Sequence, residues 1–254
     1  MNRHSLFIVG CGRNGTSLTA GLFRNSGLFM GRRLHAPSPE NPTGYFEDAN
    51  INRLNNRIIS RYVPSKGILH DGISYQCDSP GTGNGWLARI PLQRAVEATA
   101  EEEAEIRSWL QSPFCLKDTR FCYLLHLWRR HAPDAHMICV FRPPHVAAAS
   151  ILHSCFTRAG LADHAISVKQ AFEIWTLMYT HVLRRHAQTG DWLFVQYADI
   201  ISGRALDAIE KFAGSPVDRH FACSALNRTQ PPFEAPESAL SIFAELQERA
   251  RNCY

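Results

Sequence analysis

Short apolar segments alternate with amphipathic stretches along most of the chain, which is the pattern of strands and helices in turn. Four apolar segments predict buried strands, at 5–10, 113–118, 136–141 and 192–200. Apolar residues at helical spacing predict helices over 16–25, 121–131, 145–156, 168–187 and 203–212, with a final helix that ends near Arg251. This alternation predicts an α/β fold of three layers, α/β/α, with a central parallel sheet covered on both faces.

Two segments depart from this alternation. The segments 31–47 and 62–86 are rich in Gly, Pro, Ser and Asn, which predicts long loops. The segment 97–110 predicts a helix whose acidic face is solvated. Because ligands of parallel α/β proteins bind beyond the carboxyl ends of the strands, we expect the two loops to cover the functional site.

Composition limits the classes of partner. The 254 residues include 27 Lys and Arg against 23 Asp and Glu, a net charge of +4. This mild excess allows an anionic ligand but does not predict a nucleic-acid or membrane partner. The most apolar run, Leu6–Val9, is too short for a membrane span or a signal peptide, so we expect a mature cytoplasmic protein. The eight Cys form no C-x-x-C pair, which predicts reduced structural thiols and no metal site.

The strongest chemical signal is the sequence GCGRNGTSLT, which begins at Gly10 directly after the first predicted strand. Glycines let the backbone wrap an anion, while amide groups at the start of the following helix point toward it. Gly10 and Gly15 have the spacing of a Walker A loop, but Thr16 stands where that motif has its Lys. The positive charge is instead Arg13, inside the loop. The alternative interpretation is a plain Gly-rich turn.

This loop resembles the 5′-phosphosulfate-binding loop of sulfotransferases, and its P-loop-like strand–loop–helix context agrees. The match is carried by Arg13, Asn14, Gly15, Thr16 and Ser17, and Leu18 follows where the animal cytosolic branch has an adenine-stacking Trp. The resemblance implies that these residues bind the donor nucleotide.

A second segment, VFRPPHVAAAS, resembles the 3′-phosphate segment of the same family, with Arg142 and Ser150 at matching positions. Pro143 and Pro144 suit the first turn of a helix, and Ser150 lies about two turns further on, so Arg142 and Ser150 can face one phosphate.

Further segments extend the resemblance. Lys117 in CLKDTR matches the Lys that lies beside the transferring sulfonate, and Tyr197 in VQYADI matches a Tyr near the adenine. Arg228 is a weak counterpart of a terminal phosphate-binding segment, and weaker similarity covers residues 41–55.

The resemblance implies a bacterial-type sulfotransferase. Such an enzyme would move a sulfuryl group from 3′-phosphoadenosine 5′-phosphosulfate (PAPS) to a hydroxyl of a small-molecule or glycan acceptor, by in-line transfer and without a metal. Adenosine 3′,5′-bisphosphate (PAP) would be the product. We expect one domain over 1–254, with an acceptor-binding insertion at about 62–111. The sequence leaves open whether the protein forms a homodimer.

The catalytic base has several candidates, because Thr119 stands where the animal branch has its catalytic His. Glu47 is the first choice, since other branches of the family use a Glu after the first helix. Its alternative role is an acid that complements the dipole of a helix starting near Asp48. His35 and His70, both in loops expected to cover the site, are the other candidates.

The sequence leaves two other functions open. A P-loop small-molecule kinase would need a Lys at position 16 and an acidic residue that holds magnesium. A nucleotide-binding module without catalysis would keep the loop, but it would not need Lys117.

Overall fold

The computed structural model describes residues 3–39, 41–63, 67–69, 73–75, 84–157, 166–222 and 233–254. Four parallel strands form its central sheet, in the order β4 (Cys115–Lys117), β1 (Leu6–Val9), β5 (His136–Phe141) and β6 (Trp192–Gln196). Leu6 pairs with Cys115 on one side and with His136 on the other. After β1, the chain thus adds β4 on one side of β1 and then β5 and β6 on the other side. The point where the strand order changes side is where parallel α/β proteins bind ligands.

Side chains of the central strand alternate between two apolar clusters. Leu6 and Ile8 pack on one face and Phe7 and Val9 on the other, all fully buried. The first face is covered by α1 (Thr16–Gly21), α7 (Tyr197–Ile201), α8 (Leu206–Ala213) and α9 (Arg219–Ala222). The second face is covered by α2 (Ala49–Ser60), α3 (Ala100–Trp109), α4 (Phe121–Arg129), α5 (Pro144–Thr157), α6 (Val168–His181) and α10 (Glu237–Arg251).

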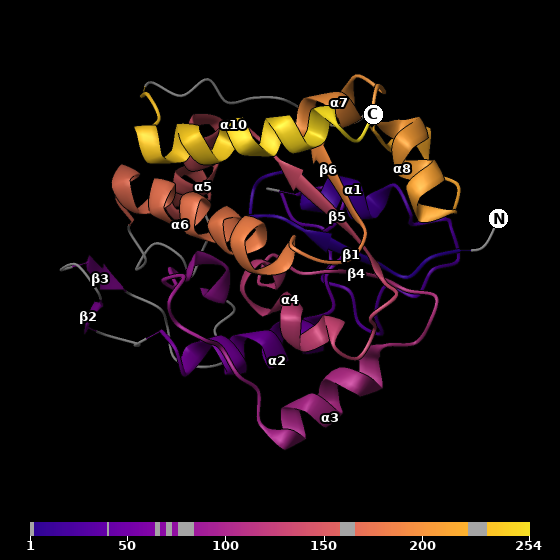
Figure 1. The fold of residues 1–254 in the computed structure, drawn as a ribbon, viewed down its shortest axis with the longest axis horizontal. Coiled ribbons are helices and arrows are strands. Elements are labelled where there is room, and N and C mark those ends of the chain that lie inside the picture. The colour runs from indigo at the N-terminus through magenta and orange to yellow at the C-terminus, as the bar shows by residue number, and fades with distance from the viewer. Residues whose placement is uncertain are drawn as a thin grey trace.

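This arrangement confirms the predicted three-layer α/β/α fold with a central parallel sheet. Figure 1 shows α5, α6 and α10 gathered on one side of the molecule and α2, α3 and α4 gathered near β4.

Several predicted boundaries were wrong. The strand expected over 192–200 ends at Gln196, and the chain turns directly into α7, in which Asp199 lies in the first turn and complements the helix dipole. The helix expected over 16–25 ends at Gly21. The predicted loop 62–86 contains two paired antiparallel strands, β2 (Gly67–Leu69) and β3 (Ile73–Tyr75), and then a 3₁₀ turn, η1 (Asn84–Leu87).

The acidic helix α3 is not simply a solvated surface. Thr99 and Glu102 form a capping box at its start, and Glu102 is buried. The Glu102 carboxylate also forms ion pairs with Arg57 of α2 and with Arg61, the C-cap residue that follows α2, at 3.2 and 2.7 Å. The prediction of a solvated face is therefore wrong at Glu102, which joins two helices.

Two buried histidines lie where α6 continues into the π-helical turn η2 (Val182–His186). Nε2 of His181 lies 2.9 Å from the carbonyl of Ile90, and Nε2 of His186 lies 3.0 Å from that of Cys122. A carbonyl only accepts, so both rings carry their proton on Nε2. Burial lowers the pKa of His181 to about 4 and that of His186 to about 3. Nδ1 of His181 has no hydrogen-bond partner among the described residues.

These histidines predict a loss of stability in mild acid. The unfolded chain binds protons at a pKa near 6.5, well above the folded values, so protonation favours unfolding as the pH falls below about 6.5. Each histidine should lower the free energy of unfolding by roughly 2 kcal/mol between pH 7.5 and 5.0. Urea denaturation at the two pH values measures this loss.

The matched control is His181→Gln, whose amide can still donate to Ile90 but does not titrate. Its loss of stability over the same interval should be smaller than that of the wild type by roughly 2 kcal/mol. Parallel losses in both proteins would contradict the assignment.

Candidate functional site

The four sequence segments expected to bind one ligand meet at the carboxyl ends of the four parallel strands. The glycine-rich loop follows β1, and Lys117 is the last residue of β4. Arg142 directly follows β5, and Tyr197 directly follows β6. Because the carboxyl ends of parallel strands lie at one edge of the sheet, residues far apart in the sequence come together there.

The glycine-rich loop is held in shape by Asn14, whose side chain is fully buried. Its amide nitrogen donates to the carbonyl of Gly12 at 3.0 Å. Its amide oxygen accepts from the backbone N–H of Arg142 at 2.9 Å and from Trp175 Nε1 at 3.1 Å. Asn14 was expected to bind the nucleotide through its place in the motif. The structure shows its side chain bracing the loop against β5 and α6.

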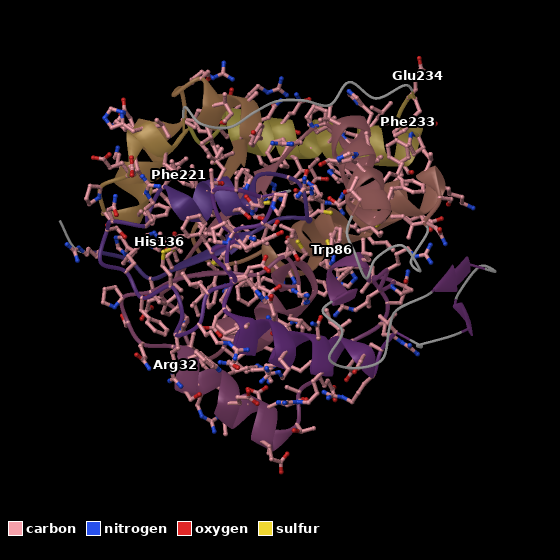
Figure 2. All side chains as sticks on the ribbon, turned by 180° about the vertical axis from the view of Figure 1, so that it is seen from behind. Arg32, Trp86, His136, Phe221, Phe233 and Glu234 are labelled. Atoms are coloured by element: carbon pink, nitrogen blue, oxygen red, sulfur yellow. The ribbon has the colours of Figure 1, made fainter. Side chains whose placement is uncertain are left out.

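Two aromatic rings press on the loop where only glycine fits. A Cβ atom on Gly12 would lie 2.7 Å from the ring of Trp86, and one on Gly15 would lie 2.4 Å from the ring of Tyr197. Gly15 also caps the N-terminus of α1 in the left-handed conformation, at φ 98°. The Trp86 side chain is buried, and Figure 2 labels it near the centre of the view. The backbone of the loop is thus enclosed from two sides.

Arg13 and Ser150 connect the two expected phosphate segments. Nε of Arg13 donates to Oγ of Ser150, on α5, at 3.1 Å. The guanidinium of Arg142 lies over the ring of Tyr197, 3.4 Å from its centroid, and burial lowers the pKa of Arg142. Nε of Arg142 is buried and has no hydrogen-bond partner among the described residues. Arg142 and Ser150 therefore line one end of the site, and Arg13 reaches from the glycine-rich loop to Ser150.

Lys117 occupies the other end, and its side chain is only 2 % exposed. Its ammonium lies 3.2 Å from Ser17 Oγ, 3.2 Å from the carbonyl of Tyr45 and 2.5 Å from Oε1 of Glu47. An ammonium has three N–H donors, and these three contacts use all of them. The cation is thus shared between the glycine-rich loop and the segment that precedes α2.

Glu47 and its neighbour Asp48 have different roles. Asp48 is the N-cap of α2 and accepts from the backbone N–H groups of Asn50 and Ile51. Its second carboxylate oxygen accepts from the backbone of Arg32 and Arg33, at 2.6 and 2.5 Å. Asp48 is thus the acid at the start of α2, whereas the Glu47 carboxylate, whose alternative role was to complement the dipole of this helix, faces Lys117.

A buried polar network next to the site was not expected from the sequence. Asp118 is fully buried and accepts from the side-chain amides of Asn52 and Asn55, each at 2.8 Å. Burial raises the pKa of Asp118, but the Arg120 guanidinium and these hydrogen bonds outweigh it, so the net pKa is lowered. Asparagines at helical spacing, 52, 55 and 56, followed by an acidic residue after a strand, were the signal that could have indicated it.

The other expected site residues are either exposed, buried in α1 or outside the described residues. His35 is exposed, and its Nε2 lies 2.8 Å from Oδ1 of Asn52 in this network. Leu18 and Thr16 are buried in α1. His70 and Arg228 lie outside the described residues.

The described residues contain neither a metal-binding cluster nor a membrane-spanning helix. No cluster of three His, Cys, Asp or Glu side chains within them has an arrangement that could hold a metal ion. No helix among them is both long and apolar enough to cross a membrane.

Comparison with known proteins gives one family. A family model described as the sulfotransferase family matches residues 5–219. No sequence among the curated proteins matches the chain.

Several solved structures are similar to the chain at low sequence identity. The sulfotransferase domain of a Synechococcus olefin synthase is 15% identical, with a TM-score of 0.50, and the match covers 96% of this chain and 94% of that one. A sulfotransferase from Mycobacterium avium is 16% identical, with a TM-score of 0.49 and coverage of 98% and 76%. The sulfotransferase domain from the curacin biosynthetic pathway is 13% identical, with a TM-score of 0.48 and coverage of 97% and 98%.

The enclosed loop predicts a large effect of Gly15→Ala. A Cβ atom there meets both an unfavourable φ and the Tyr197 ring, so the substitution should lower the free energy of unfolding by about 3–4 kcal/mol. Gly203→Ala is the matched control, because Gly203 has φ 82° but its Cβ would meet nothing closer than 4.0 Å. It should lose only about 1–2 kcal/mol. Equal losses in urea denaturation would show that the ring contact is unimportant.

Proposed function

The chain belongs to the sulfotransferase family, and from this premise we propose that it transfers a sulfuryl group from PAPS to a hydroxyl group of a small-molecule or glycan acceptor. One observation carries the proposal: Lys117, Ser17 and Glu47 meet at the mouth of the glycine-rich loop. A cation, a hydroxyl and a carboxylate at one point are the groups needed to stabilise a leaving group, hold an anion and accept a proton.

The proposed donor nucleotide has two anionic groups, and the site would bind one at each of its ends. The loop amides at the start of α1, with Arg13, Thr16 and Ser17, would hold the 5′-phosphosulfate. Arg142 and Ser150 would hold the 3′-phosphate, which would supply the missing partner for the buried Nε of Arg142. The adenine would lie near Tyr197 and Leu18, and Arg228 would add a further phosphate contact.

The proposed reaction is an in-line displacement at sulfur. The acceptor oxygen forms a new S–O bond while the S–O bond to the 5′-phosphate breaks, and PAP leaves. Charge that develops on the bridging oxygen would be stabilised by Lys117, as in phosphoryl transfer. To reach that oxygen, the Lys117 ammonium must give up one of its three present contacts. The acceptor proton would pass to the Glu47 carboxylate.

In this proposal the cationic side chains and the N–H groups of the protein offset the negative charge of the nucleotide, and no metal takes part. The acceptor would bind over the 62–111 insertion, whose described part includes Trp86 against the loop. Buried free thiols, Cys11, Cys122 and Cys139, support a reducing compartment such as the cytoplasm.

Nucleotide binding tests the proposal directly. PAP at about a hundredfold excess over its dissociation constant should raise the midpoint of thermal unfolding by about 5 °C or more. ATP with magnesium should not, which separates this function from a small-molecule kinase. Sulfuryl transfer from labelled PAPS to a panel of hydroxyl acceptors then tests catalysis. Stabilisation by ATP with magnesium but not by PAP would overturn the proposal.

Arg142→Ala provides the control for the donor orientation. Because a hydrogen bond to a charged group is worth about 1.5–3 kcal/mol, the variant should bind PAP at least about tenfold more weakly. Its affinity for adenosine 5′-phosphosulfate, which lacks the 3′-phosphate, should change little. Equal losses of affinity for both ligands would show that Arg142 does not bind the 3′-phosphate.

Glu47→Gln tests the proposed base. Gln keeps the shape of the side chain but does not accept the acceptor proton, so turnover should fall by roughly a hundred- to ten-thousandfold. Affinity for PAP should not fall, because the variant removes the carboxylate that competes for the Lys117 ammonium. His35→Ala and His70→Ala should retain turnover. If turnover survives in Glu47→Gln and is lost in either histidine variant, the base is a histidine.

A further inference from the structure

The hydroxyl of Ser17, in the first turn of α1, accepts hydrogen bonds from two groups that only donate. Lys117 Nζ lies 3.2 Å from Ser17 Oγ, and the side-chain nitrogen of Asn41 lies 3.3 Å from it. Neither an ammonium nor an amide nitrogen accepts a hydrogen bond. The oxygen of Ser17 therefore uses both lone pairs, and its own proton must point toward a third group.

The orientation of the Asn41 amide is fixed by its neighbours. Its nitrogen donates to the carbonyl of Gly44 at 2.7 Å, and its oxygen accepts from Thr43 Oγ1 at 3.2 Å. A flipped amide would bring two acceptor oxygens together at Gly44, so the nitrogen must face Ser17. Asn41 itself is held by a backbone pair with Ser38, at 2.9 and 3.2 Å.

The proton of Ser17 has no acceptor among the described residues, although Ser17 is half-buried next to the glycine-rich loop. We infer that Asn41 is a positioning residue that, together with Lys117, fixes Ser17 as a hydrogen-bond donor toward the 5′-phosphate end of the nucleotide. This inference rests on the proposed function, which identifies the ligand. A hydroxyl already oriented toward an anion needs no rearrangement when the ligand binds, which is the benefit of preorganised donors.

A double-mutant cycle tests whether Asn41 acts through Ser17. Calorimetry would measure the binding of PAP and of adenosine 3′-monophosphate, which lacks the 5′-phosphate, to the wild type, Asn41→Ala, Ser17→Ala and the double variant. Ser17→Ala should weaken PAP binding about tenfold and Asn41→Ala about threefold. The double variant should be no weaker than Ser17→Ala. Binding of adenosine 3′-monophosphate should be unchanged throughout.

Ser38→Ala is the control for a general loosening of the loop. It removes the 2.6 Å contact between Ser38 Oγ and Tyr45 OH and the 3.3 Å contact of Ser38 Oγ with the backbone N–H of Asn41. The side chains of Asn41 and Ser17 are left unchanged, so PAP affinity should stay within about twofold of the wild type. Additive losses in the double variant, or equal losses for both nucleotides in Asn41→Ala, would overturn the inference and leave the proposed function standing. A wild-type protein that does not bind PAP would overturn the proposed function as well.

Discussion

A lysine ammonium that is almost wholly withdrawn from water needs an anionic partner close by, and this requirement organises the site. Lys117 meets it with Glu47, and removing one member of a buried ion pair is typically destabilising by about 3–5 kcal/mol. Each member also directly precedes a buried aspartate. Asp118 ties the end of β4 to the asparagines of α2, while Asp48 caps α2 and holds the backbone of the 31–47 segment. The Lys117–Glu47 ion pair and the two adjacent aspartates therefore connect β4, α2 and the covering 31–47 segment.

Much of this fold could be predicted because its signals are local. Each signal lies within about ten consecutive residues of the chain. The signals are the apolar runs of strand length, the glycines after the first predicted strand and the prolines after the third. Lys117 and Arg142 each lie at or just beyond the end of a predicted parallel strand, so the fold class alone predicts that they share an edge. The family resemblance was confirmed by the family model, which matches residues 5–219.

The rest depends on contacts between distant segments, which periodicity does not show. Glu47 and Asp48 are adjacent acids, and only the position of Lys117, seventy residues away, distinguishes the ion-pair partner from the helix cap. The sequence YADI alternates well enough for a strand, but Tyr197 begins a helix. The contact of Arg13 with Ser150 likewise joins residues that are 137 positions apart.

The close packing of Trp86 on Gly12 has a consequence for how this protein can diversify. The segment expected to recognise the acceptor touches the backbone of the loop expected to hold the donor. A smaller side chain at position 86 would leave a void beside that loop, and any side chain at position 12 would displace the indole. Changes at the two positions are thus expected to co-vary across descendants. New acceptor preferences would arise more readily from residues of the insertion that do not rest on the loop.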